Sequence, residues 1–155
     1  MSPVKPIPDG MNMIIPHLVV NDAARAIDFY KKAFGAEERG RFNTPDGKIM
    51  HASIAINGSP LFLNDPMMGA KDPNGLGGSP VTLMIYVNDV DATFQKAVSA
   101  GATATMPVAD QFWGDRYGML KDPFGHMWEI ATHKEDLSPE EMDKRGKEAM
   151  AQMRH

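Results

Sequence analysis

The sequence predicts an α+β protein made of two tandem βαβββ modules, and three observations indicate this fold class. A pattern of strand, Asn-Asp, helix and Gly-Ala occurs at residues 15–36 and again at residues 82–102. Three short apolar runs, separated by turn residues, follow each predicted helix. A stretch rich in Gly and Pro, residues 66–80, separates the two copies. A unit that occurs twice around a linker indicates an internal duplication.

The opening strand of each copy is predicted at residues 15–20 and 81–87. In the second copy the aliphatic side chains alternate onto one face, namely Val81, Leu83, Ile85 and Val87. The opposite face is mixed and carries Thr82, Met84 and Tyr86. One face is therefore suited to a core, and the other is free for a different role.

The Asn-Asp pair after each opening strand predicts the start of a helix, because a carboxylate oxygen can accept hydrogen bonds from the first free amides. Asp22 and Asp89 hold these positions. Gly35 and Gly101 follow the helical runs, where a left-handed C-cap favours a residue without Cβ. We therefore expect a helix between each Asp and the Gly that follows it.

Three further strands complete each module. In the first copy we expect them at residues 36–43, 48–56 and 60–65, with Asp46-Gly47 and Asn57-Gly58 as hairpin turns. In the second copy we expect them at residues 103–109, 116–121 and 126–132.

These elements give the expected domain organisation. It consists of an N-terminal arm (1–11), a first module (12–65), an irregular linker without a helix or strand (66–80), a second module (81–135) and a C-terminal helix (136–155). Ser138 and Glu141 form a capping box around Pro139 at the start of that helix. Its mixed charge and thin apolar stripe favour a docking or dimer-clasp role over membrane binding.

The composition excludes several functional classes. The chain has 155 residues, with 16 basic side chains, 20 acidic side chains and no Cys. Without Cys there is no disulfide, zinc ribbon, iron–sulfur cluster or thiol nucleophile, and such a chain fits the reducing cytoplasm. The mildly acidic balance argues against a nucleic-acid partner. No apolar stretch has the length of a membrane span or the character of a signal peptide.

Several motifs in order resemble the vicinal oxygen chelate superfamily, which includes glyoxalase I, bleomycin-resistance proteins, fosfomycin-modifying enzymes and extradiol dioxygenases. Beyond the repeat, they are PDGKIMHA (45–52), GDR (114–116), DPFGHMWE (122–129) and ATHKEDLSPEEM (131–142). Within the superfamily they are similar to the PhnB-like branch. The resemblance implies the glyoxalase/bleomycin-resistance fold, in which curved mixed sheets surround a cleft, often with a divalent metal, in a homodimer.

The resemblance places the metal ligands of the superfamily at four positions, which here are Ile15, Phe62, Thr82 and Glu129. Only Glu129 is a competent ligand, and one carboxylate with water cannot hold a transition metal tightly. His17 lies two residues beyond Ile15, on the same strand face, and could join it. We therefore expect no cofactor, and a divalent metal, if one binds, would use Glu129 and His17.

The candidate ligand-binding residues line the cleft that the resemblance implies: His17, Phe62, Thr82, Met84, Tyr86, Trp113, Arg116 and Glu129. Glu129 is also the candidate catalytic residue, because burial on a mixed face would raise its pKa and suit it to proton transfer. The alternative is a strand-end carboxylate paired with Arg116 or Arg41. Trp113 offers a flat apolar surface with a polar tip, or else a contact to the core or to a second copy.

Structural roles stand beside these functional ones. The sequence favours a structural role for three histidines: His17 as a histidine hydrogen-bonded to a neighbour, His51 as a structural position, and His126 as a turn residue. The chain contains 13 Met, of which Met119 and Met127 are placed either to line the cleft or to fill a core.

Three functions remain open from the sequence. The first is a small-molecule-binding protein of the glyoxalase/bleomycin-resistance type, with an amphipathic or aromatic ligand in the inter-module cleft. The second is a metal-dependent lyase, isomerase or transferase, and the third is a protein interaction module. The number of metal ligands discriminates between the first two, and the incomplete set favours binding over catalysis.

Overall fold

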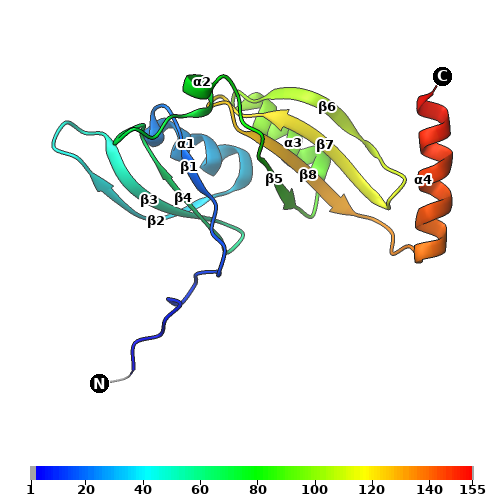
Figure 1. Ribbon diagram of the computed structural model, residues 1–155, viewed down its shortest axis with the longest axis horizontal. Coiled ribbons are helices and arrows are strands. Elements are labelled where there is room, and N and C mark those ends of the chain that lie inside the picture. Colours follow the sequence, from blue (N-terminus) through cyan, green and yellow to red (C-terminus); the bar gives the residue numbers. More distant parts are fainter. Residues whose placement is uncertain (1–2, 155) are drawn as a thin grey trace.

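The structure is a computed structural model that describes residues 3–154. Residues 1 and 2 of the expected arm and residue 155 of the expected C-terminal segment lie outside the described residues. The first module contains β1 (His17–Val19), α1 (Ala23–Phe34), β2 (Glu37–Asn43), β3 (Ile49–Ile56) and β4 (Ser59–Asn64). The second contains β5 (Thr82–Tyr86), α3 (Val90–Ser99), β6 (Thr103–Asp110), β7 (Asp115–Lys121) and β8 (Met127–His133). Between the modules lies α2 (Pro73–Leu76), and α4 (Pro139–Met153) follows them (Figure 1).

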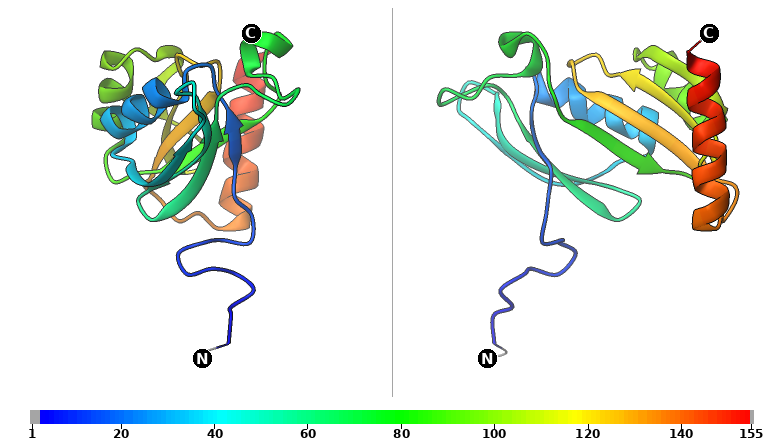
Figure 2. Two further views of the ribbon diagram at one scale, coloured as in Figure 1. Left: turned by 90° about the vertical axis from the view of Figure 1, so that its left-hand side faces the viewer. Right: turned by 45° about the vertical axis from the view of Figure 1, so that its right-hand side comes forward.

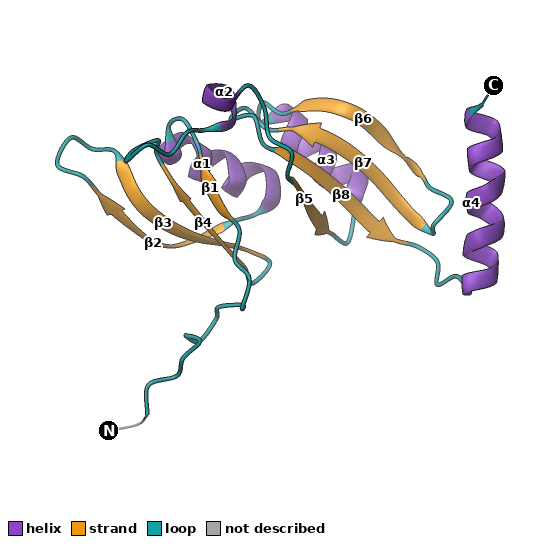
Figure 3. Ribbon diagram, viewed as in Figure 1, coloured by secondary structure: helices purple, strands orange, loops and turns teal. Residues whose placement is uncertain are grey.

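Each module forms its own four-stranded mixed sheet. The strand orders are β1-β4-β3-β2 and β5-β8-β7-β6. In both sheets the first strand pairs in parallel with the last, and the other neighbours are antiparallel. Two parallel strands can be joined only by a connection that crosses over the sheet. In each module this connection starts with a helix, α1 or α3, which covers one face of the sheet (Figure 3). The predicted α+β fold with two βαβββ modules is confirmed.

The local signals for the helix ends are largely confirmed. The carboxylates of Asp22 and Asp89 each accept a hydrogen bond from the backbone N–H three residues later. Gly35 is the left-handed C-cap of α1, with φ of 67°. The C-cap of α3 is Ala100, one residue earlier than predicted, and Gly101 follows it with φ of 122°.

The expectation that residues 66–80 contain no element is wrong, because residues 73–76 form α2. The buried Asp72 is its N-cap and accepts a hydrogen bond from a backbone N–H inside the helix. Pro73, at the first helical position, suits a helix start. This short helix depends on tertiary contact, since Pro73 is buried and lies directly against Gly125 of the second module.

The two modules pack through α1 and α3, which lie against one another (Figure 2). Phe34 of α1 contacts Trp128 of β8, with ring centroids 4.7 Å apart. The Tyr30 hydroxyl donates to the Asp122 carboxylate at 2.6 Å, and Trp128 Nε1 donates to the same carboxylate at 2.9 Å. Burial, and then the adjacent Asp122, raises the pKa of Tyr30 well above its usual value, so the hydroxyl keeps the proton that it donates. One core therefore spans both modules.

The C-terminal helix α4 lies at the end of the second module farthest from the first (Figure 1). Ser138 caps it by accepting a hydrogen bond from a backbone N–H of the first turn. Gly146 lies against Phe112, but Met150 and Met153 are 60% and 84% exposed. The apolar stripe of α4 is thus left mostly uncovered. Among residues 3–154, no helix combines the length and the apolar character that crossing a membrane requires.

Candidate functional site

Each sheet has one face covered by its helix and a second face opposite to it, called here the open face. Registered neighbours on adjacent strands share a face. The open face of the second module therefore carries Thr82, Met84, Tyr86, Asp115, Tyr117, Met119, Lys121, Met127, Glu129, Ala131 and His133. Met84 and Tyr86 are 41% and 59% exposed. The mixed face predicted for the opening strand is thus directed away from the core.

A buried carboxylate organises one end of this open face. Asp115, only 3% exposed, accepts hydrogen bonds from the Tyr86 hydroxyl at 2.9 Å, from Trp113 Nε1 at 3.1 Å and from His133 Nδ1 at 2.8 Å. Burial acts to raise the pKa of Asp115, but the hydrogen bonds from His133, Tyr86 and Trp113 outweigh it and lower the pKa. Asp115 is therefore an ionised acceptor at neutral pH.

His133 lies between two carboxylates. Its Nδ1 is 2.8 Å from Asp115 Oδ1, and its Nε2 is 2.8 Å from Asp136 Oδ1. The hydrogen bond to Asp136, followed by that to Asp115, raises the pKa of His133. A ring nitrogen needs a hydrogen to donate to a carboxylate, so the two contacts together require the doubly protonated imidazolium.

Glu129 occupies the middle of the open face. Its registered neighbours are Met84 on one side and Met119 on the other, so the carboxylate lies among soft apolar side chains. Burial, and then the adjacent Glu129 carboxylate, raises the pKa of Tyr117. This phenol consequently stays protonated and is available as a donor beside Glu129.

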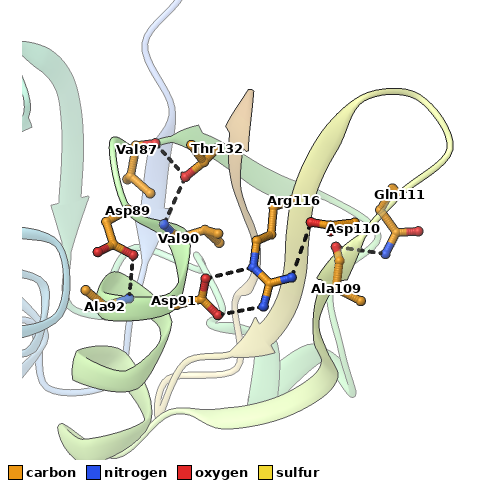
Figure 4. A network of polar contacts seen from close by, with 10 residues as sticks. All are labelled: Val87, Asp89, Val90, Asp91, Ala92, Ala109, Asp110, Gln111, Arg116 and Thr132. Carbon is orange, nitrogen blue, oxygen red and sulfur yellow. Dashed lines mark hydrogen bonds and ion pairs between the residues drawn. The ribbon is translucent and has the colours of Figure 1, made fainter. Parts of the chain in front are cut away.

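The expectation that Arg116 lines the same surface as Glu129 is wrong. The period-two alternation of β7 directs Arg116 to the helix-covered face, where it binds Asp91 at 2.7 and 2.9 Å and Asp110 at 3.2 Å (Figure 4). Arg41 is engaged with a carboxylate of its own strand. Neither arginine is a partner of Glu129, so the alternative of a strand-end ion pair is also wrong.

The open face of the first module has a different character. It carries His17, Phe42, His51, Ser53, Phe62 and Asn64. The Asn64 amide nitrogen donates to the Asp65 carbonyl, so its Oδ1 is the acceptor for His17 Nε2 at 2.6 Å. The ring of His51 contacts His17 and Phe62, with centroids 5.8 and 4.8 Å away. His17 is therefore a hydrogen-bonded histidine within an aromatic cluster.

The cavities do not bring the predicted residues together. One cavity of about 380 Å³, between β1, β5 and the linker, includes His17 and His126, whose Nε2 lies 3.0 Å from the Val19 carbonyl oxygen. A second, of about 690 Å³, includes Met84 and Tyr86. The linings of these two cavities do not include Phe62, Thr82, Trp113 or Glu129. Within one chain, the predicted ligand-binding residues are divided between the open faces of the two modules, and Arg116 lies on neither.

The side chains present do not fit a metal centre of the superfamily type. β1 begins at His17, so Ile15 precedes the strand, and the registered partner of Phe62 is His17. The partner of Glu129 is Met84, two residues beyond the expected position. The four corresponding positions thus hold His, Phe, Met and Glu, of which two are good ligands. Residues 3–154 contain no group of three or more His, Cys, Asp or Glu arranged to hold a metal ion.

Sequence reasoning missed Asp115 and His133. Both lie in motifs that carry the family resemblance, at residues 114–116 and 131–142. The contact between them becomes apparent only from the pairing of β7 with β8, which places Asp115 directly opposite His133. The sequence did contain one signal for this arrangement. Side chains alternate along a strand, so Asp115 and Tyr117 share a face and Arg116 lies on the other.

Comparison with known proteins agrees with this architecture. The sequence matches the family described as the Glyoxalase/Bleomycin resistance protein/Dioxygenase superfamily over residues 10–130. An uncharacterized protein of Mycobacterium tuberculosis is 52% identical over 132 residues, which cover 82% of this chain and 78% of that protein.

Two solved structures extend the likeness to the fold. A gene product of Arabidopsis thaliana is 29% identical, with a TM-score of 0.64 and coverage of 78% of this chain and 98% of that one. The PhnB protein from Bacillus cereus is 19% identical, with a TM-score of 0.61 and coverage of 78% and 99%, which is a likeness of fold. On the sequence match and the paired βαβββ modules together, the chain belongs to the Glyoxalase/Bleomycin resistance protein/Dioxygenase superfamily.

Proposed function

We propose that this protein binds a small aromatic or amphipathic molecule on the open face of its second module. The observation that carries the proposal is the set of side chains gathered there. Met84 and Tyr86 are substantially exposed beside the Glu129 carboxylate, and Trp113 borders the same surface, with its ring centroid 5.3 Å from that of Tyr117. Exposed aromatic and thioether surface around a few polar groups is typical of small-molecule sites.

The charges on this face favour a ligand with positive charge. Glu129 has no cationic partner among the ion pairs of the described residues. The faces of Tyr86 and Trp113 attract cations through their ring electrons. Two cations share this face: His133 is already paired with Asp115 and Asp136, and the exposed Lys121, at the end of β7, takes part in none of the ion pairs of the described residues. A planar aromatic cation would therefore be recognised by both the rings and the carboxylate.

We further propose that the site is completed in a homodimer. In this arrangement the first-module open face of one copy covers the second-module open face of the other, so His17 and Phe62 of one copy approach Glu129 of its partner. Support comes from the exposed aromatic surface on both faces, with Phe42 at 63% and Tyr86 at 59% exposed. Apolar surface left open on two faces of one chain is typical of an interface between copies.

The binding proposal is tested with proflavine, a planar aromatic cation, and acridine, which has the same ring system and is neutral at neutral pH. Proflavine is expected to bind and to raise the melting temperature. Truncation of the indole in Trp113→Ala should weaken proflavine by roughly 1–3 kcal/mol, the range for a large aromatic contact. Glu129→Gln keeps the shape and removes the charge, so it should weaken proflavine far more than acridine.

Glu148→Gln, on the exposed surface of α4, is the matched control and should leave both affinities unchanged. Fluorescence titration measures the affinities. If proflavine binds and its affinity is the same in all three variants, the ligand site lies elsewhere and the open face is not the binding surface.

The dimer is tested by light scattering at micromolar concentration, where the expected mass is twice that of the 17.0 kDa chain. Phe42→Glu places a charge in the proposed interface and should shift the mass to that of one chain, because burial of an unpaired carboxylate is costly. Leu76→Glu, on the 68% exposed Leu76 of α2, is the control. A monomeric mass for the unmodified protein would contradict the proposal.

A further inference from the structure

The Asp115 carboxylate joins three side chains that come from separate parts of the second module. Tyr86 belongs to β5, Trp113 to the turn before β7, and His133 to the end of β8. Each donates one hydrogen bond, at 2.9, 3.1 and 2.8 Å respectively. The carboxylate is 3% exposed, so it lies beneath the groups that it holds.

We infer that Asp115 is a positioning residue of the binding face: it fixes the rings of Tyr86 and Trp113 in the arrangement that receives a ligand, without touching the ligand itself. This inference rests on the proposed function. Tyr86 is 59% exposed and its ring would otherwise be free to change rotamer. A ring already held in place loses less conformational entropy when a ligand binds, and this strengthens binding.

His133 completes the arrangement from the other side. Because its imidazolium bridges Asp115 and Asp136, it balances the charge of the buried Asp115 carboxylate. Tyr86 and Trp113 both donate to Oδ2 of Asp115, whereas His133 uses Oδ1. Oδ2 of Asp115 thus holds the side chains of Tyr86 and Trp113, and Oδ1 holds the cation that balances the charge of the carboxylate. Removal of the charge should release both sets of contacts.

The chain offers a matched pair of substitutions, Asp115→Asn and Asp91→Asn. Asp91 also accepts hydrogen bonds in the second module, from Arg116, but it lies on α3 on the opposite side of the sheet and is exposed. Both changes replace a carboxylate by an amide of the same shape. An effect that comes only from the loss of a negative charge would appear in both variants. An effect on the binding face would appear in Asp115→Asn and not in Asp91→Asn.

Two measurements need no ligand. The emission of Trp113, assigned by comparison with Trp113→Phe, should change in Asp115→Asn because its indole loses a charged acceptor. The imidazole of His133, followed by NMR during a pH titration, should lose its proton at lower pH in the same variant. Both signals should stay as in the unmodified protein in Asp91→Asn.

The third measurement is the affinity for proflavine. Asp115→Asn is expected to weaken it roughly tenfold, as release of two side chains would. Tyr86→Phe, which removes only the hydroxyl that Asp115 holds, should weaken proflavine in the unmodified protein and add no further loss in the Asp115→Asn background.

The outcomes separate this inference from the proposed function. If the unmodified protein does not bind proflavine, the proposed function fails, and the emission and the titration still decide whether Asp115 positions the two side chains. If emission and titration are unchanged in Asp115→Asn, the inference is overturned. It is also overturned if they change while proflavine affinity stays the same, since Asp115 would then have a structural role alone.

Discussion

Replacement of Asp122 by Ala is expected to lower the free energy of unfolding by roughly 3–5 kcal/mol, a large share of the stability of an ordinary domain. The Asp122 carboxylate is 3% exposed and accepts four hydrogen bonds. Two come from the side chains of Tyr30 and Trp128, and two from the backbone N–H groups of Phe124 and His126. The substitution leaves all four donors without this partner, and three of the four bonds are in buried surroundings.

The loss should appear as a lower midpoint in urea unfolding followed by circular dichroism. Tyr30→Phe removes one of the four donors and should cost roughly 1–2 kcal/mol, because the carboxylate keeps the other three. Asp91→Asn, at an exposed ion pair, should lower the stability far less than Asp122→Ala does. A loss for Asp122→Ala no larger than that of Asp91→Asn would show that the junction between the modules does not depend on this carboxylate.

The second large effect is expected at Gly114, where Ala should destabilise the protein by roughly 2–4 kcal/mol. Gly114 has φ of 97°, and a Cβ there would lie 2.6 Å from the Glu135 carbonyl oxygen. The Gly114 carbonyl also accepts the backbone N–H groups of Lys134 and Glu135. The new methyl group would therefore push apart the turn before β7 and the segment that leads to α4.

Gly47 provides the matched control for this prediction. Its φ of 87° is similar, but a Cβ there would meet nothing within 4 Å among the described residues other than Gly47 and its two chain neighbours. Gly47→Ala should therefore show only the conformational cost of a left-handed Ala, roughly 1–2 kcal/mol. Thermal unfolding of both variants measures the difference, and equal losses would mean that the contact with Glu135 is relieved without strain.

Much of the fold could be predicted because its signals are local. The alternation in residues 82–86 gives one packed and one exposed face, and the carboxylates of Asp22 and Asp89 cap the helices that follow. The Asn57-Gly58 turn has φ of 46° and 82°, as its sequence predicts. α2 could not be predicted in the same way, because its four residues contain Pro and Gly and depend on burial against the second module.

The candidate site was less predictable because it depends on which strands become neighbours. Glu129, Met84 and Tyr86 were placed correctly on one face by counting along each strand. The prediction for Arg116 was wrong because the pairing of β7 with β8 decides which residues of β7 share a face with Glu129. This pairing puts Arg116 on the other face, beside α3. Its charge alone gave no indication of which face it would take.

The duplicated βαβββ order, the helix N-caps and the hairpin turns can all be read from the chain alone, since each is encoded within a few neighbouring residues. The three contacts by which Asp115 holds Tyr86, Trp113 and His133 together depend instead on the folded arrangement of the strands. The link that Asp122 makes between the two modules through Tyr30 depends on the folded arrangement in the same way. Each of these buried carboxylates takes at least one partner from a distant segment, such as Tyr86 for Asp115 and Tyr30 for Asp122, and these partners meet only once the sheets have formed and packed.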